Sequence, residues 1–198
     1  MRRRTTAGLL PLLFAACTIA PAAEPAGPST GAGLLPPPGF GTLLQDDITM
    51  RLLSRELEIA VTPLDESVTR ATAPDTYRRL AALAGRHRAT APRGSHLFLV
   101  SFFSDQPGVR FEPEEVQLIS RGLRMRPLAV LPVTPTWGQR RVQQRQAEMA
   151  VYAFPGEIDL ESDLLLAYEL EETASWMQIL PRIQAERARA RARAGVGG

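Results

Sequence analysis

The stretch HLFLVSFFS, residues 96–104, decides the fold class, because it is apolar on both faces of an extended chain. A strand of this kind is buried on both sides, so we expect it at the centre of a sheet. Working outward, shorter apolar or alternating runs predict further strands near Leu57–Val61, Val116–Ser120, Leu128–Val133, Ala147–Phe154, Leu164–Leu170 and Trp176–Leu180. Pro132 cannot donate to a sheet ladder, so we expect either an edge strand or a bend there.

About seven short strands separated by turns predict a mostly β protein, an antiparallel β-sandwich. The strands do not alternate regularly with helices, which argues against a parallel α/β sheet. One inserted helix is expected at about residues 74–89, where Tyr77, Leu80 and His87 share a stripe and Pro74 suits a first turn. A second, Ala/Arg-rich helix is expected to start near Pro181, with arginines pointing all round it.

The N-terminus resembles a bacterial lipoprotein signal. Residues 2–4 are arginines, and the apolar stretch 7–16 is too short to span a bilayer. The stretch ends in two alanines before Cys17, the only cysteine. We therefore expect residues 1–16 to be a signal peptide and Cys17 to be the lipidation site. A plain secretory peptide cut after Ala22 and a retained N-terminal anchor remain open, and all three place the body outside the cytoplasm.

The rest of the chain divides into a linker, a body and a tail. Residues 17–45 are rich in proline, glycine and alanine, and such a segment cannot bury enough apolar area to offset its conformational entropy. We expect a lipidated cysteine and a disordered linker over 17–45, the β-sandwich domain over 46–181, and a basic helical tail over 182–198. A body of this length can hold a full hydrophobic core.

Charge is distributed unevenly along the chain. Residues 46–180 contain 15 arginines and 19 carboxylates, a net charge of −4, while residues 182–193 contain five arginines and one glutamate. The body therefore lacks the basic surface of a nucleic-acid-binding protein. Outside the cytoplasm, the tail's natural partners are anionic lipid headgroups or acidic envelope polymers. We predict that the contacting side chains are those of Arg187, Arg189, Arg191 and Arg193.

The composition excludes several kinds of covalent, metal-binding and catalytic site. One cysteine excludes an intramolecular disulfide and a multi-thiolate metal site, and two histidines exclude a three-histidine site. All 23 basic residues are arginine, so there is no lysine for a Schiff base or a phosphate-binding loop. Asparagine is absent as well. The sequence contains no glycine-rich nucleotide motif and no serine in a nucleophile-elbow context.

The remaining candidates for chemistry are weak. His87 and His96 lie nine residues apart and suit a metal site only if acids join them. Four acids at alternate positions, in FPGEIDLESD, are better explained as a solvated loop than as a calcium or glycosidase site. Trp137 is expected to plug the core rather than to line a ligand surface, and the arginines at 140, 141 and 145 to lie on a solvated connection. We predict no catalytic residues, no cofactor and no metal.

Residues 96–180 resemble the immunoglobulin-like domains of secreted bacterial lipoproteins of the DUF4352-like type. The matching features are the strand HLFLVSFFS, the run FEPEEVQLIS leading into a turn at Arg121-Gly122, and the strand AEMAVYAF with its acidic loop and closing strand. The resemblance implies an immunoglobulin-like sandwich that acts as an extracytoplasmic adhesion or accessory module. It implies no catalytic residue.

Taken together, the sequence predicts an envelope-anchored, non-catalytic binding or structural accessory lipoprotein. Its expected partners are the membrane, through the N-terminal lipid, and an envelope protein or anionic envelope polymer, with no nucleic acid. The alternative is a periplasmic small-ligand or metal-binding protein, or a minor enzyme, with a site made from scattered acids and Trp137. A further alternative is a stabiliser of the membrane surface in which the tail is the active part.

Overall fold

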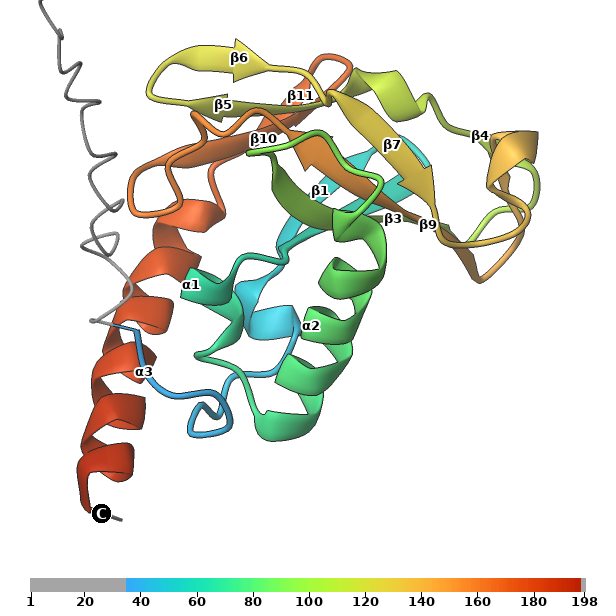
Figure 1. Cartoon of the computed structure of the whole chain (residues 1–198). Helices are drawn as coiled ribbons and strands as arrows, with labels where there is room; N and C mark the ends of the chain where they lie inside the picture. The colour runs from blue at the N-terminus through green and yellow to red at the C-terminus, as the bar shows by residue number, and fades with distance from the viewer. Residues whose placement is uncertain (1–34, 197–198) are drawn as a thin grey trace, which may run out of the picture.

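The computed structural model describes residues 35–196, so the expected signal peptide, Cys17 and most of the expected linker lie outside the described residues. The described chain is a mostly antiparallel β fold of two sheets, a short ribbon and three α-helices (Figure 1). The first sheet has five strands in the order β1 (Met50–Ser54), β2 (Leu57–Pro63), β3 (His96–Ser104), β9 (Gln146–Phe154) and β7 (Ala129–Pro132).

The second sheet has four strands in the order β11 (Glu171–Thr173), β10 (Leu164–Tyr168), β5 (Val116–Ser120) and β6 (Leu123–Met125). A separate ribbon pairs β4 (Val109–Arg110) with β8 (Arg141–Val142). Two expectations are confirmed: the 96–104 strand is the central strand of its sheet, and the strand with Pro132 lies at an edge.

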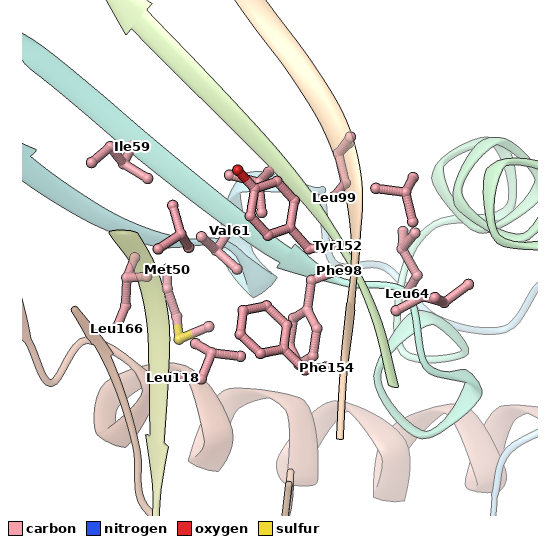
Figure 2. Packing of buried hydrophobic residues seen from close by; sticks show 14 of the residues in the cluster. Met50, Ile59, Val61, Leu64, Phe98, Leu99, Leu118, Tyr152, Phe154 and Leu166 are labelled. Atoms are coloured by element: carbon pink, nitrogen blue, oxygen red, sulfur yellow. The ribbon is translucent and has the colours of Figure 1, made fainter. Parts of the chain in front are cut away.

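The central strand is buried on both faces, which explains its continuous apolar sequence. Phe98 and Phe102 on one face are fully buried, and Leu97 and Leu99 on the other are 1% and 7% exposed. Both sheets contribute to one core, in which Met50, Val61 and Phe98 of the first sheet meet Leu118 and Leu166 of the second (Figure 2). Removing this much apolar area from water is the main stabilising contribution.

The α-helices are α1 (Glu66–Thr69), α2 (Pro74–Arg88) and α3 (Trp176–Val196), and single 3₁₀ turns cover η2 (Asp46–Ile48), η3 (Pro113–Glu115) and η4 (Trp137–Gln139). The inserted helix α2 lies where the sequence predicts it. The short α1 was not expected; Asp65 starts it by accepting a hydrogen bond from the Ser67 N–H at 2.9 Å. None of the helices within residues 35–196 combines the length and the apolarity needed to cross a membrane.

The C-terminal region corrects two expectations. Trp176–Leu180 is not a closing strand but the start of α3, which runs through Pro181. Four buried side chains share one face of this helix: Trp176, Ile179, Ile183 and Ala190. They are 3, 4 and 7 residues apart, which is the spacing of one face of an amphipathic α-helix. Residues 182–196 are therefore not a separate tail. They continue a helix that lies along the body, beside the segment where the described chain begins (Figure 1).

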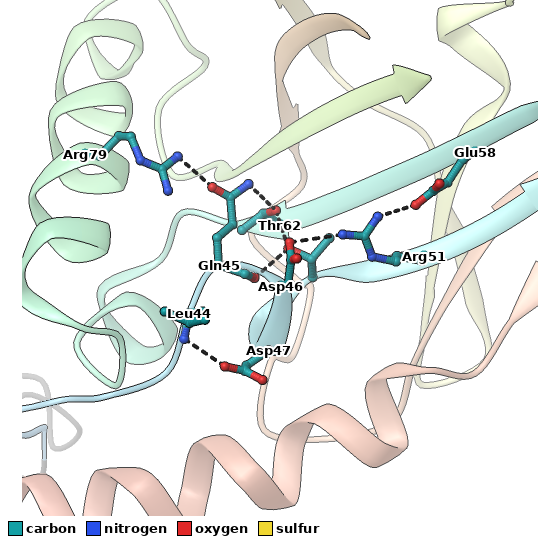
Figure 3. Close-up of polar contacts among 9 residues, drawn as sticks. Leu44, Gln45, Asp46, Asp47, Arg51, Glu58, Thr62 and Arg79 are labelled. Carbon is teal, nitrogen blue, oxygen red and sulfur yellow. Dashed lines mark hydrogen bonds and ion pairs between the residues drawn. The ribbon is translucent and has the colours of Figure 1, made fainter. Parts of the chain in front are cut away.

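The expected end of the linker at residue 45 is also wrong. Leu43 exchanges backbone hydrogen bonds with both ends of the Ala71–Ala73 turn, at 3.2 and 2.8 Å. Gln45 accepts from the Arg79 guanidinium at 2.7 Å, and the Leu44 N–H donates to the Asp47 carboxylate at 2.8 Å (Figure 3). Residues 40–47, called the lead-in segment below, are therefore held against the body by hydrogen bonds that composition does not reveal.

Candidate functional site

The most elaborate polar site in the described chain joins the lead-in segment to α3. At its centre is Glu186, which is 2% exposed. Its carboxylate accepts from the Thr42 hydroxyl at 2.9 Å and from the Arg193 guanidinium, and Arg189 lies 3.8 Å away. A buried carboxylate is stable only when paired, and here a hydroxyl and two guanidinium groups supply the partners. We call Phe40, Thr42, Glu186 and Arg193 the α3 clamp.

The lead-in segment completes the α3 clamp through its backbone. The Phe40 carbonyl accepts two hydrogen bonds from Arg193, from Nε at 3.0 Å and from Nη2 at 2.7 Å. At Gly41, a Cβ atom would lie 2.2 Å from the Ala71 carbonyl carbon, so only glycine lets the backbone approach this closely. The segment is thus held on one side by α3 and on the other by the turn after α1.

The four arginines predicted to contact an anionic surface occupy different environments. Arg187 is buried, donating to the Ser67 carbonyl and to Glu161, each at 2.6 Å. Arg193 belongs to the α3 clamp. Arg189 and Arg191 are exposed on the outside of α3. The arginines therefore do not point equally to solvent, and part of the cationic charge is used inside the fold.

The two histidines are separated by the fold. His87 is half-buried near the end of α2, where desolvation and the neighbouring Arg86 lower its pKa. His96 Nδ1 lies 3.3 Å from Asp65 Oδ2, at the start of α1. This contact raises the pKa of His96 and lowers that of Asp65, since each charge favours the other. Residues 35–196 hold no group of three metal-ligating side chains.

The acidic loop between β9 and β10 serves the fold. Ile158 and Leu160 are buried, so the acids at alternate positions face outward. Asp159 accepts from the Glu161 N–H and pairs with Arg121, and both contacts lower its pKa. Glu161 pairs with Arg187 at 2.6 Å. Two of the four carboxylates, those of Asp159 and Glu161, are thus held in separate ion pairs.

Trp137 lies in an aromatic cluster rather than in an open site. It is 6% exposed, and its ring centroid is 4.9 Å from that of Phe111 and 5.8 Å from that of Phe102. Nearby, the buried Glu148 carboxylate accepts from two threonine hydroxyls, those of Thr134 and Thr136. Trp137 therefore packs in the core, and the Glu148 carboxylate has hydroxyl partners there.

The predicted basic run at residues 140–145 forms a solvated connection with partial pairing. Arg140 pairs with Glu114 at 2.8 Å and with Glu112 at 3.2 Å. Arg145 lies 3.9 Å from Asp105, with both side chains largely exposed. Arg141 donates to the Gly108 carbonyl at 3.3 Å and has no carboxylate within 4 Å among the described residues.

Sequence reasoning missed Phe40, Thr42 and Glu186 as site residues. One signal was present for Glu186, the single acid inside the arginine-rich segment. Another was the apolar spacing 176, 179, 183 and 190, which predicts that one face of the segment is buried. Nothing local marks Thr42, because its partner is 144 residues away. Comparison of the chain with known protein families, with curated proteins and with solved structures finds no match.

Proposed function

We propose that this protein is a lipid-anchored, non-catalytic accessory of the bacterial envelope, tethered through Cys17 outside the cytoplasm. The observation that carries the proposal is the α3 clamp. It fixes the point where an N-terminal tether joins the body, through hydrogen bonds from Thr42 and Arg193. In a domain that is anchored by a lipid, such a contact restricts the orientations that the folded body can take relative to the membrane.

The arginine-rich helix supports the same proposal. The start of the described chain lies beside α3 (Figure 1), so a lipid at the end of the tether holds this side of the body near the bilayer. Arg189 and Arg191 are exposed there, and each basic group near an anionic leaflet contributes about 1 kcal/mol of attraction. In this proposal Arg189 and Arg191 contact headgroups, while Arg187 and Arg193 hold the helix in place.

Within residues 35–196, aromatic and aliphatic side chains of both sheets pack into one core. These observations favour a binding or structural role. The immunoglobulin-like type of sandwich remains our proposal for the fold. It rests on the two antiparallel sheets, and the pairing of β5 with β10, which are separated by the 43 residues 121–163, agrees with a Greek-key-like crossover.

The proposal is tested by expressing the full chain and its Cys17→Ser variant in a lipoprotein-processing bacterium. We expect the wild type to gain lipid mass, to begin at Cys17 and to remain in the membrane fraction, while Cys17→Ser is soluble, because acyl chains supply most of the membrane affinity. Intact mass spectrometry and fractionation measure this. If both proteins are soluble and begin near Ala23, the anchor is absent and the proposal fails.

A matched pair of variants then tests the helix. Arg189→Gln combined with Arg191→Gln keeps Phe40, Thr42, Glu186 and Arg193 and removes only the longer contact of Arg189 with Glu186, at 3.8 Å. Deleting residues 187–193 would instead remove Arg187 from its buried site and Arg193 from the α3 clamp. For the lipidated protein, we expect the double variant to bind vesicles containing phosphatidylglycerol more weakly and to bind neutral vesicles as before. If the wild type and the double variant bind phosphatidylglycerol vesicles equally well, Arg189 and Arg191 do not contact headgroups. The lipid alone would then account for membrane binding.

A further inference from the structure

A second surface feature lies at the opposite end of the molecule from α3, around β4 (Figure 1). There the turn between β1 and β2, the loop before β4, and β8 enclose a groove of about 380 Å³. Three arginines line it: Arg55 from the turn, Arg110 from β4 and Arg141 from β8. Two acids, Glu56 and Glu169, line it as well, so the groove carries one net positive charge from its side chains.

The arrangement of these arginines is unfavourable unless an anion is present. Arg110 and Arg141 are direct cross-strand partners in the β4–β8 ribbon. Like charges at such a position destabilise a strand pair. Within the described residues, the guanidinium groups of Arg55 and Arg110 have no side-chain hydrogen bond and no ion pair. This contrasts with Arg140 next to the ribbon, which has two glutamate partners.

The turn that carries Arg55 adds a second observation. Arg55 has a φ of 52°, and Glu169 on the opposite side of the groove has a φ of 51°. Side chains other than glycine, asparagine and aspartate rarely take this left-handed conformation, which costs about 1–2 kcal/mol per residue. Both residues begin two-residue hairpin turns, between β1 and β2 and between β10 and β11, and such turns use a positive φ. Here it places charged side chains at the rim of the groove.

We propose that this groove binds an oxyanion of the phosphate type, either free or carried by a larger envelope molecule. Guanidinium groups recognise phosphate through paired, charge-assisted hydrogen bonds, and an anion between Arg110 and Arg141 replaces their repulsion by attraction. Three buried residues lie next to these arginines in the chain or in the lining of the groove: Val142, Leu57 and Tyr168. Their burial limits the movement of the backbone that carries the arginines. The inference does not depend on the lipid anchor.

The test is a calorimetric titration of the full-length protein with pyrophosphate at low salt. We expect saturable binding with a Kd of about 1 mM or tighter. Each of Arg55→Gln, Arg110→Gln and Arg141→Gln weakens it by about tenfold or more, the loss of one charge-assisted contact. Glu169→Gln tightens it, because a repelling carboxylate is removed. Arg78→Gln, an exposed change on α2 that does not line the groove, leaves binding unchanged.

A thermal measurement separates this role from a merely structural one. Without ligand, Arg110→Gln raises the melting temperature by about 1–3 °C, because it removes the cross-strand repulsion. Adding pyrophosphate raises the melting temperature of the wild type by more than it raises that of Arg110→Gln. A titration without saturation, the same loss in Arg78→Gln, or a lower melting temperature for unliganded Arg110→Gln would each overturn the proposal.

A last arm identifies the source of the phosphate. Vesicles of phosphatidylglycerol carry phosphate on a lipid, and pyrophosphate carries it in solution. If the arginine variants lose binding to both, the groove takes the phosphate of a lipid headgroup as well as a free one. If they lose pyrophosphate alone, the ligand is a soluble phosphate compound. Both results support the oxyanion site and differ only in where the anion resides.

Discussion

At the scale of single residues, arginine takes positions that other proteins give to glycine or asparagine. Arg55, Arg121, Arg140 and Arg145 all have φ between 51° and 55°. The left-handed conformation favours glycine, asparagine and aspartate, whose short side chains tolerate it. The chain contains no asparagine, so the usual solution for such turns is missing from its composition. These four arginines therefore carry local strain that substitution can relieve.

We expect Arg145→Asn to stabilise the protein by up to about 1 kcal/mol, since asparagine tolerates the left-handed conformation. The ion pair that is lost, to Asp105 at 3.9 Å, is largely exposed and contributes little. Thermal unfolding should show a gain of about 2–4 °C. Gln144→Asn is the control, because its φ is not positive, and it should give no gain. An equal gain in both variants would contradict the role of the backbone.

At the scale of elements, α3 is one helix with two functions. Its first turns bury Trp176, Ile179 and Ile183 against the body, and the middle of the helix buries the carboxylate of Glu186. Helical stability in proteins comes mainly from such tertiary packing rather than from propensity. The arginine-rich half lacks large apolar side chains, so the contacts of Glu186, Arg187 and Arg193 hold it in place.

We expect Glu186→Ala to destabilise the protein by about 2 kcal/mol, which is less than the roughly 3–5 kcal/mol for a fully buried pair, because the Arg193 side chain is 42% exposed. Hydrogen exchange should accelerate in the lead-in segment and in the last turns of α3, and the sheets should remain protected. Arg182→Ala is the control. Its ion pair with Asp47, at 3.7 Å, is exposed, and its loss should change little. If hydrogen exchange in these two segments is unchanged in Glu186→Ala, the α3 clamp does not stabilise their contact.

At the scale of the whole molecule, the pair of His96 and Asp65 ties the start of the central strand to the start of α1. His96 has a raised pKa in the folded protein, mainly through its hydrogen bond to Asp65. Its contribution to stability is therefore complete below the ordinary value of 6.5 and is lost as the pH rises through the raised pKa. Asp65 has a lowered pKa, so its contribution is complete above 3.8 and is lost as the pH falls.

We therefore expect stability to decline as the pH rises above about 6.5, and His96→Gln to abolish that decline. Urea unfolding at several pH values measures it. The matched control is His87→Gln. Since the pKa of His87 is lowered in the fold, its protonation costs stability on the acid side, and the decline at higher pH should persist in this variant. A wild type whose stability is constant across neutral pH would contradict the pair's role.

The sequence by itself determined six of the strands, β2, β3, β5, β7, β9 and β10, together with the central position of β3 and the inserted helix. These follow from hydrophobic periodicity, which acts over a few residues. The sequence missed the short strands β4, β6, β8 and β11 as well as β1, and it placed a strand where α3 begins. Only the tertiary structure decided where the lead-in segment ends, which arginines are buried, and which loops meet at the groove. Thr42 and Glu186, or Arg55 and Arg110, come together because the sheets bring distant segments into contact, and no local pattern records such distances.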